Sequence, residues 1–463
     1  MIIDTHAHID MDSYDEDRTE VIQRARDNGV DYILNVGCDV ESSRRSIELA
    51  ERYDFIYGTA GIHPHDVKSI DNRTYDDLRG LLAHPKMVAL GEVGLDFYKN
   101  YSPQDQQKKH FRKQVELARE LKKPIIVHSR DANEDTIAIL SDYFPKDPST
   151  RSGIFHCFSG NQGLADRALE MGFYISFSGS VTFKKSDELR AVAKTVPADR
   201  LFVETDCPFL SPVPRRGKRN EPSYVIHTAQ LIADIRGLNI KDVQRTTALN
   251  FFELFGIGKD VKTGKISYQI RNSLYLNLTT RCTADCSFCT RLTRPVVQGY
   301  NLKLDREPTA EEVWRSIDNC TKYDEIVFCG YGEPTLRLDV IKKVSKKIKE
   351  AGGKVRLNTN GHGNVINKRN ILPELKGLID SVSVSLNADT AETYDQIVRP
   401  LPGLRSGIYD KVKEFIEEAK NYIPKVQATI VTHQEGVDEE KCEEISKNEF
   451  GVNYRPRRYN IVG

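Results

Sequence analysis

The chain has 463 residues, and a single hydrophobic core rarely grows beyond roughly 250 to 300 residues, so we expect two domains. Its 67 Lys and Arg residues balance 67 Asp and Glu residues, which excludes a protein held to nucleic acid by overall charge. No apolar run approaches the ~20 residues of a membrane-spanning helix, and the first residues contain neither a basic leader nor a cleavage site. We therefore expect a cytoplasmic protein without membrane contact.

Short apolar segments alternate with amphipathic helical segments through the first half of the chain. A helix is expected over 104–123, and a last one over 239–257. The predicted strands lie near residues 1–6, 31–36, 56–61, 87–92, 124–128, 153–156, 173–178 and 201–205. Eight β-α repeats in about 255 residues are typical of a (β/α)8 TIM barrel. The Gly- and Lys-rich stretch 256–272 follows, so we place the boundary near residue 259 and predict domains 1–258 and 259–463.

The second half continues the β-α alternation with fewer units. Its predicted strands lie at 273–279, 325–330, 354–361, 381–387, 426–432 and near 459–463. Five or six units in about 205 residues are too few to close an eight-stranded barrel. The fold class is therefore α/β throughout, with an N-terminal TIM barrel and a C-terminal open, partial (β/α)6-type barrel.

Polar residues gather at the ends of the predicted barrel strands, where TIM-barrel enzymes carry their active sites. They are His6, His8, His63, His65, Glu92, His128, His156, Glu204 and Asp206. A lone histidine of this kind is usually a hydrogen-bonded core residue, but six strands presenting such groups at one face indicate a metal site. His6 and His8 point to the same side of their strand, because the side-chain period is two. Four histidines and two carboxylates suffice for two ions roughly 3.5 to 4 Å apart.

Six motifs in this half resemble the TatD family of metal-dependent deoxyribonucleases, in the amidohydrolase superfamily. They are THAH, GIHPH, GEVGLDFY, HSRDA, HCFSG and ETDCPFL, and they span essentially all of residues 1–258. The resemblance implies that His6, His8 and Asp206 bind one metal, that His128 and His156 bind the other, and that Glu92 bridges them. It also implies that Asp206 is the general base, that His63 and His65 orient the phosphate, and that Glu204 supports the ligands. Mg, Mn or Zn would suit this ligand set.

Two further features bear on this site. Cys157 and Cys207 each follow a predicted ligand, so the site is expected to be sensitive to oxidation or to softer metals. Basic residues follow predicted strands 7 and 8, where TIM barrels commonly bind phosphate; they are Lys184, Lys185, Arg215, Arg216, Lys218 and Arg219. These residues form either a solvated surface or a guide for the backbone of DNA or another nucleic acid.

Three of the nine cysteines, Cys282, Cys286 and Cys289, lie within eight residues in a Cx3Cx2C pattern. Three thiolates hold three irons of a 4Fe-4S cluster and leave the fourth iron open for a small ligand. A structural zinc site is the alternative, but it needs a fourth ligand at comparable spacing, and Cys320 and Cys329 are isolated in sequence.

The cysteine pattern, with Phe288 before its third cysteine, resembles the radical S-adenosylmethionine (SAM) superfamily over about residues 270–460. The segment Gly330-Tyr331-Gly332-Glu333 resembles the GGE motif, whose backbone receives the amino group of SAM, although Tyr331 departs from the commonest form. The polar strand ends resemble regions that contact the ribose and carboxylate of SAM, namely Asn358, Asn360, Ser383, Ser385 and Asn387. The resemblance implies a 5'-deoxyadenosyl radical, an electron donor such as flavodoxin or ferredoxin, and an unknown substrate.

The two halves together resemble the TatD-associated radical SAM proteins, and three interpretations stay open. The first is a bifunctional enzyme. In the second, the chain is a hydrolase whose cluster domain only senses redox state or binds a partner. In the third, the first domain is a small-molecule amidohydrolase or phosphoesterase.

Overall fold

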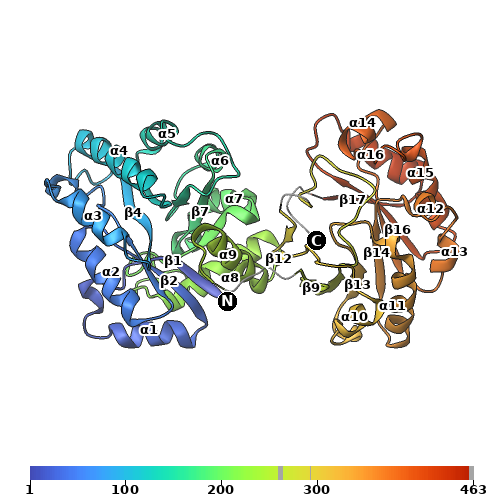
Figure 1. Ribbon diagram of the computed structural model, residues 1–463, viewed down its shortest axis with the longest axis horizontal. Coiled ribbons are helices and arrows are strands. Elements are labelled where there is room, and N and C mark those ends of the chain that lie inside the picture. Colours follow the sequence, from blue (N-terminus) through green and yellow to red (C-terminus); the bar gives the residue numbers. More distant parts are fainter. Residues whose placement is uncertain (259–263, 292–293, 458–463) are drawn as a thin grey trace. The chain divides into compact units, whose positions relative to one another are not determined.

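The computed structural model divides the chain into two compact units, Met1–Lys259 and Asp260–Gly463, which we call the N-terminal and C-terminal units (Figure 1). The structure describes residues 1–258, 264–291 and 294–457. No helix in these ranges combines the length and the apolar character needed to cross a bilayer.

The N-terminal unit contains all eight predicted strands, paired in parallel in the order of the sequence. They are β1 (Ile2–Ala7), β2 (Val30–Val36), β3 (Ile56–Ala60), β4 (Met87–Asp96), β5 (Ile125–Arg130), β6 (Gly153–Phe155), β7 (Phe173–Phe177) and β8 (Leu201–Val203). The ends of β1 and β8 are joined by backbone hydrogen bonds from His8 N to Cys207 O and from Asp206 N to His6 O, both 2.9 Å. The TIM barrel predicted from the sequence is therefore confirmed.

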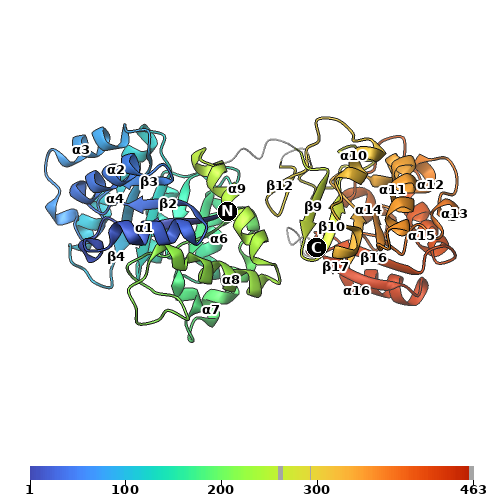
Figure 2. The same ribbon diagram turned by 90° about the horizontal axis from the view of Figure 1, so that it is seen from below.

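Nine α-helices of this unit cover the barrel (Figure 2). They are α1 (Arg18–Asp27), α2 (Val40–Arg52), α3 (Thr74–Leu82), α4 (Gln104–Glu120), α5 (Asn133–Ser141), α6 (Gln162–Glu170), α7 (Asp187–Thr195), α8 (Val225–Arg236) and α9 (Ile240–Phe255). Sequence signals set their limits: a capping box of Asn239 and Asp242 begins α9, and Gly256, in the left-handed conformation, ends it. On α4 the buried face includes Phe111 and Val115, which pack into the core.

The C-terminal unit is built on an open seven-stranded sheet in the order β17-β16-β15-β14-β13-β10-β9. Its strands are β9 (Ser267–Ile270), β10 (Ser273–Leu276), β13 (Glu325–Phe328), β14 (Val355–Thr359), β15 (Ser381–Ser385), β16 (Lys425–Val431) and β17 (Asn453–Arg457), and β11 (Val296–Val297) pairs separately with β12 (Tyr300–Asn301). Six strands are parallel and β9 is antiparallel to β10. The partial barrel is confirmed, but its two edges differ from expectation.

Both edge strands lie where the sequence gives a weak signal. β9 falls within the stretch 256–272, for which the sequence predicts only a domain boundary, and its Tyr268 and Ile270 are buried. The strand expected near 459–463 lies outside the described residues, and the sixth parallel strand is β17, whose sequence NYRPR is poor in apolar residues. Edge strands tolerate proline and need only one neighbouring strand, so their hydrophobic pattern is weaker.

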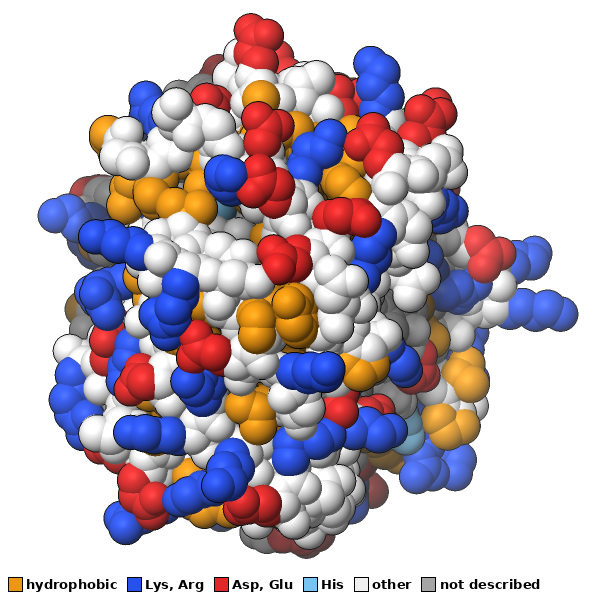
Figure 3. Space-filling view, turned by 90° about the vertical axis from the view of Figure 1, so that its right-hand side faces the viewer, with side chains coloured by type: hydrophobic (Ala, Val, Ile, Leu, Met, Phe, Trp, Pro, Cys, Tyr) orange, Lys and Arg blue, Asp and Glu red, His pale blue; other side chains and the backbone are white. Residues whose placement is uncertain are grey.

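The helices of this unit lie along the outer side of the sheet (Figures 1 and 2). They are α10 (Ala310–Arg315), α11 (Leu338–Glu350), α12 (Gly363–Ile366), α13 (Leu372–Leu375), α14 (Ala391–Ile397), α15 (Ile408–Ala419) and α16 (Glu439–Glu444). On the face in Figure 3, basic and acidic side chains are interspersed and hydrophobic side chains form only small patches. This face is therefore a solvated exterior.

Candidate functional site

A buried carboxylate, Glu92 on β4, lies at the centre of the histidine cluster in the N-terminal unit. Its Oε1 atom is 2.8 Å from Nδ1 of His128 and 2.8 Å from Nε2 of His156. The same atom is 3.4 Å from Nε2 of His63, and Oε2 is 3.3 Å from Nε2 of His6. Burial alone would raise the pKa of Glu92, but the rings of His156, His63 and His128 lower it well below its usual range. Glu92 is therefore an ionised carboxylate between imidazoles from four other strand ends.

A second carboxylate, Asp206, approaches the pair of histidines on β1. Its Oδ1 atom is 3.9 Å from Nε2 of His6 and 3.6 Å from Nε2 of His8, and these two ring nitrogens are 3.1 Å apart. Nδ1 of His8 lies 2.8 Å from the carbonyl oxygen of Val36. A ring that donates from Nδ1 to this carbonyl presents its Nε2 lone pair to the centre of the site.

The packing of β4 against β5 depends on Gly94 of the GEVGLD motif. A Cβ atom at this position would lie 1.9 Å from the carbonyl oxygen of His128, and the backbone of Gly94 has a φ of 145°. A larger residue would therefore push the two strands apart and separate Glu92 from His128. The glycine in this motif thus serves the geometry of the site.

Glu204 at the end of β8 supports the site from behind. It is fully buried, and its carboxylate accepts hydrogen bonds from the backbone N–H of Cys157 and from the hydroxyl of Ser176, both at 2.5 Å. Its Oε1 atom is 3.5 Å from Nδ1 of His156. Glu204 therefore helps to orient the His156 ring.

Asp96, at the last position of β4, was not singled out in the sequence, although it belongs to the GEVGLD motif. It is buried, and its Oδ2 atom lies 2.9 Å from Nε2 of His65 and 3.2 Å from Nε2 of His128. The carboxylate joins one histidine of GIHPH to a predicted metal ligand. His63, the other histidine of GIHPH, lies within reach of Glu92 and His128 as a third potential ligand.

Two more groups, half-buried Cys38 and buried Asp4, adjoin the cluster without a sequence signal. Sγ of Cys38, after β2, is 3.7 Å from Nδ1 of His8 and 3.9 Å from Glu92 Oε2. The carboxylate of Asp4 accepts hydrogen bonds from the backbone and the hydroxyl of Thr205, and burial raises its pKa to about 8. Asp4 thereby fixes the segment that carries Glu204 and Asp206.

The residues of the cluster fit divalent ions. Three overlapping groups have ligand atoms within 4.8 Å of one another: His6, His156 and Asp206; His6, His8 and Glu92; and His63, Glu92 and His128. Nδ1 of His6 is buried and has no hydrogen-bond partner among the described residues. The other ring nitrogen of His6, Nε2, lies between the carboxylates of Glu92 and Asp206. Imidazoles and carboxylates together form a donor set suited to Zn²⁺ or Mn²⁺, and carboxylates also suit Mg²⁺.

The basic loop after β8 is largely engaged in contacts within the unit. Arg219 forms an ion pair with Asp17, and the guanidinium of Arg216 lies 3.7 Å from the centre of the Phe183 ring. Arg215 lies over Tyr224. These contacts hold three of the four predicted basic residues of this loop against the unit, and the two interpretations of the basic residues stay predictions.

In the C-terminal unit, the three cysteines lie in a loop after β10 that docks on neighbouring segments. Ser287 N donates to Ile397 O at 2.8 Å. Gly332 packs against the start of the loop, because a Cβ atom there would lie 2.3 Å from Thr279 O and 2.4 Å from Arg281 O. Tyr331, the departure from the GGE pattern, donates from its hydroxyl to Val296 O at 2.7 Å. The glycine-rich segment therefore forms a cradle against the cysteine loop.

The carboxylate of Glu333 is hydrogen-bonded within the C-terminal unit. Its carboxylate accepts hydrogen bonds from Thr335 N, from the hydroxyls of Thr335 and Thr359, and from Asn360 N, at 2.6 to 3.0 Å. Asn360 in turn donates to Thr283 Oγ1 at 2.9 Å and lies 3.9 Å from Cys282 Sγ. Glu333 thus ties β14 to the cysteine loop, and its backbone N–H also donates to Arg281 O at 2.9 Å.

A cavity of about 270 Å³, here called the inner cavity, brings most of the predicted cluster and SAM residues together. Its lining includes Cys282, Cys286, Phe288, Cys289, Gly330, Gly332, Glu333, Asn358, Asn360, Ser383, Ser385 and Asn387. The amide oxygens of Asn358 and Asn387 are buried without hydrogen-bond partners in the described ranges. These orphaned acceptors, the cradle and three thiols fit a ligand such as SAM at a cluster. Cys329, isolated in sequence, also lines this cavity.

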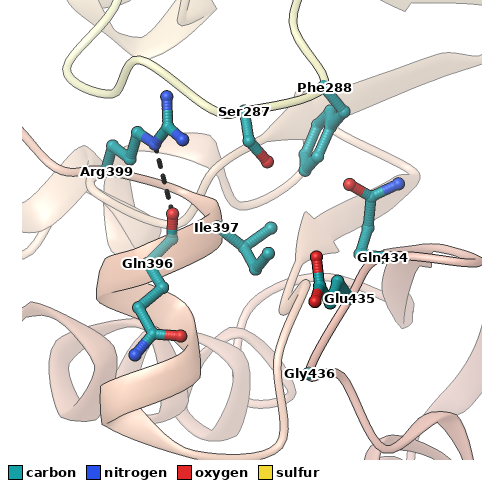
Figure 4. Close-up of a pocket in the computed structure, with 8 residues that line it drawn as sticks. All are labelled: Ser287, Phe288, Gln396, Ile397, Arg399, Gln434, Glu435 and Gly436. Atoms are coloured by element: carbon teal, nitrogen blue, oxygen red, sulfur yellow. Dashed lines mark hydrogen bonds between the residues drawn. The ribbon is translucent and has the colours of Figure 1, made fainter.

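A second, open hollow of about 630 Å³ lies on the outer side of the cysteine loop (Figure 4). It is lined by Ser287, Phe288, Gln396, Ile397, Arg399, Gln434, Glu435 and Gly436, and Arg399 Nε donates to Gln396 O at 3.2 Å. Phe288 lines both this hollow and the inner cavity. The cysteine loop is therefore reachable from outside.

Comparisons with known proteins match both units of the chain. The family model for TatD related DNase matches residues 3–256. The chain belongs to the TatD family. The model of the radical SAM superfamily matches residues 276–446, so the chain joins a TatD-type metal-dependent hydrolase domain to a radical SAM domain.

The TatD relatives align with the N-terminal unit. The metal-dependent hydrolase YabD of Bacillus subtilis is 44% identical over 257 residues, which cover 56% of this chain and all of YabD. The 3'-5' ssDNA/RNA exonuclease TatD of Erwinia tasmaniensis is 36% identical over 262 residues, covering 55% of this chain and all of that protein. The crystal structure of YJJV, a TatD homolog from Escherichia coli, is 27% identical with a TM-score of 0.52 and covers 56% of this chain and 98% of its own.

Proposed function

We propose that the chain is a bifunctional enzyme whose TatD unit hydrolyses phosphodiester bonds in nucleic acid and whose radical SAM unit generates a 5'-deoxyadenosyl radical. The observation that carries the first activity is the central position of Glu92 among histidines from other strand ends. The observation that carries the second is the joint lining of one cavity by three cysteines and the glycine-rich segment. The predicted domain limits, 1–258 and 259–463, follow this division.

In the TatD unit, His6, His8 and Asp206 would hold one divalent ion, His128 and His156 the other, and Glu92 would join the two. Bound there, the ions supply an acidified water molecule and positive charge opposite the phosphate oxygens. Asp206 would accept the proton of that water. His63 has two candidate roles, because it is predicted to orient the phosphate and yet lies in a potential ligand group.

Exposed aromatic rings beside the site support a nucleic acid with unstacked bases as the substrate. Among the described residues, few large apolar side chains are strongly exposed, and three of them are Tyr98 (57%), Tyr101 (56%) and Phe209 (51%). The Phe209 ring is 6.4 Å from the ring of His8, and the Tyr101 ring is 4.7 Å from that of His65. Exposed rings of this kind stack on bases, and Lys99, over both tyrosines, adds positive charge.

The experiment that tests the hydrolase is the Glu92→Ala substitution, assayed on single-stranded DNA with Mg²⁺, Mn²⁺ or Zn²⁺. We expect kcat/KM to fall by about 10³-fold or more, since a charged group central to transition-state stabilisation is removed. Glu20→Ala, at an exposed position of α1, is the matched control. Circular dichroism should show a folded barrel in both variants. Full nuclease activity of Glu92→Ala, or of chelated wild-type enzyme, would contradict the proposal.

In the radical SAM unit, three cysteines and the glycine-rich segment would hold the cofactors. Cys282, Cys286 and Cys289 would ligate a 4Fe-4S cluster, and the segment Gly330–Glu333 would receive SAM through its backbone. When bound and reduced, the cluster and SAM supply a 5'-deoxyadenosyl radical that abstracts hydrogen from a substrate. The protein would orient SAM through the buried amide oxygens of Asn358 and Asn387 and would exclude water. An electron donor such as flavodoxin or ferredoxin would dock over the outer hollow beside Phe288.

Two alternatives are separated by product analysis. If the cluster only senses redox state or binds a partner, reduced protein with SAM will release no 5'-deoxyadenosine. If the TatD unit acts on small esters or amides, it will hydrolyse these faster than single-stranded DNA. The exposed rings around the metal site favour the nucleic acid.

A further inference from the structure

Three arginines line the inner cavity of the radical SAM unit: Arg356 on β14, and Arg455 and Arg457 on β17. Side chains two residues apart on a strand share one face, so Arg356 lies on the same face of β14 as Asn358 and Asn360. On β17, Arg455 and Arg457 share a face in the same way. None of these positions belongs to a cofactor motif of the sequence.

Arg356 is buried, with 5% of its surface exposed. One of its terminal nitrogens is 2.9 Å from Glu325 Oε1 and 3.4 Å from the hydroxyl of Tyr275. Its Nε atom is buried and has no hydrogen-bond partner among the described residues. Glu325 therefore satisfies one edge of the guanidinium and leaves another without an acceptor.

Arg457 has still fewer polar contacts in the described part of the chain. One of its terminal nitrogens lies 3.4 Å from Ser385 Oγ, a long distance for a hydrogen bond, and its Nε is buried without a partner. Burial lowers the pKa of Arg457, and charge repulsion from Arg455 and Arg356 lowers it further, whereas Cys329 raises it. Arg356 and Arg457 thus each bring to this cavity a buried N–H donor without an acceptor among the described residues.

Burying a cation without an acceptor is strongly unfavourable, so a cavity built this way is suited to an anion. Two acidic side chains of this unit, Glu325 and Glu333, do not supply acceptors for these remaining N–H donors. Glu325 is committed to Arg356, and the oxygens of Glu333 are occupied by hydrogen bonds from Thr335, Thr359 and Asn360. An arginine fork matches the paired oxygens of a phosphate or carboxylate.

Arg356 is separated from the cluster along β14, whereas Arg457 lies closer to the predicted SAM residues, beside Ser385. Asn360, which lies 3.9 Å from Cys282 Sγ, is four residues further along the strand direction of β14. At the rise of a β-strand, four residues correspond to about 13 Å. Arg356 therefore lies deep in the inner cavity, below the level at which the cysteine loop and the glycine-rich segment meet.

We propose that Arg356 and Arg457 bind the anionic group of the radical substrate, which is a small molecule carrying a phosphate or a carboxylate. The stacked rings of Tyr268 and Tyr275, 5.3 Å apart between centres, form an aromatic part of the same cavity wall for the rest of that molecule. This inference rests on the proposed radical function. SAM also carries a carboxylate, so the test must distinguish the cofactor from the substrate.

The test uses the full chain with a reconstituted cluster, in a Glu92→Ala background so that the hydrolase site contributes the same low binding to every sample. Inorganic phosphate, dAMP and acetate are the probes, and equilibrium dialysis measures their affinities. We expect Arg356→Gln/Arg457→Gln to weaken the best of these anions at least tenfold, because two charge-assisted contacts are lost. Arg315→Gln, which changes an exposed arginine of the same unit, should bind like the parent.

SAM provides the second readout. Its affinity, and the 5'-deoxyadenosine formed without substrate, should stay within about twofold of the parent in the double variant. Arg356→Gln also leaves Glu325 without its ion pair and could disturb folding. Two further variants, Arg457→Gln alone and Arg356→Gln/Glu325→Gln, are therefore the folding controls. A preference for phosphate or dAMP identifies a phosphate ester, and a preference for acetate identifies a carboxylate.

Two results would overturn the inference. Equal affinity for all three anions in the parent and the double variant would show that the arginines serve only the fold. Parallel loss of SAM affinity, with phosphate competing against SAM, would assign them to the carboxylate of the cofactor. A parent protein without a cluster or without 5'-deoxyadenosine would instead refute the proposed radical function.

Discussion

Asp96 offers a sharp test of how the TatD unit prepares its metal ligands. Its Oδ2 atom accepts from Nε2 of His65 at 2.9 Å and lies 3.2 Å from Nε2 of His128. Burial would raise its pKa, but hydrogen bonding to His128 and to the backbone N–H of Lys99 lowers it, so the group is ionised. A His128 ring that donates from Nε2 to this carboxylate presents its Nδ1 lone pair beside Glu92.

The Asp96→Asn substitution keeps the size of the side chain and removes the charge that selects this tautomer. Loss of such a supporting carboxylate typically weakens metal binding by about 10- to 100-fold. We therefore expect the concentration of Mn²⁺ at half-maximal activity to rise by that factor, and excess Mn²⁺ to restore most of kcat. Nuclease assays across a Mn²⁺ titration measure the change, and Asp105→Asn, at an exposed position of α4, is the control.

A merely structural role for Asp96 predicts a different pattern. The variant would then lose thermal stability and activity together, and added Mn²⁺ would not restore the rate. An unchanged Mn²⁺ dependence in a folded Asp96→Asn variant would refute the argument that this carboxylate orients a ligand.

Three further predictions concern the cluster, the units and pH. Anaerobically reconstituted protein should contain about four irons per chain, lost in a triple Ala variant of Cys282, Cys286 and Cys289; a count near eight would refute a single cluster. Fragment 1–258 should retain metal-dependent hydrolysis and fragment 259–463 should cleave SAM when reduced; a folded, metal-loaded but inactive first fragment would contradict this. Burial lowers the pKa of His362 to about 4, so its contribution to stability is present above pH 6.5 and lost as pH falls towards 4. Between pH 7 and 5, the unfolding free energy of the radical SAM unit should fall by about 2 kcal/mol more in the wild type than in His362→Gln, measured by urea denaturation; equal falls would count against it.

Much of the metal centre could be predicted from the sequence because its residues follow strands whose hydrophobic pattern is strong. The eight strands of the TatD unit have a clear hydrophobic pattern in the sequence, and the barrel fold brings their carboxyl ends to one face. His6 and His8 needed only the period of a β-strand to be placed together. The cysteine loop could be predicted equally well, because its three cysteines lie close together in the sequence.

The tertiary structure decided the features that depend on distant strands. In the sequence Asp96 is an ordinary strand-end residue, and only the fold places it beside His65 and His128. Cys329 is isolated in the sequence, and only the fold places it in the wall of the inner cavity. β17 escaped prediction because an edge strand tolerates polar residues and proline, and this strand carries Arg457. The sequence by itself determined the fold class and the residues that could hold each cofactor. Only the folded sheet, which brings β14 and β17 around one cavity, revealed that Arg356 and Arg457 have N–H donors without acceptors. The sequence cannot show this, because the acceptors near an arginine depend on which distant strands the fold brings beside it.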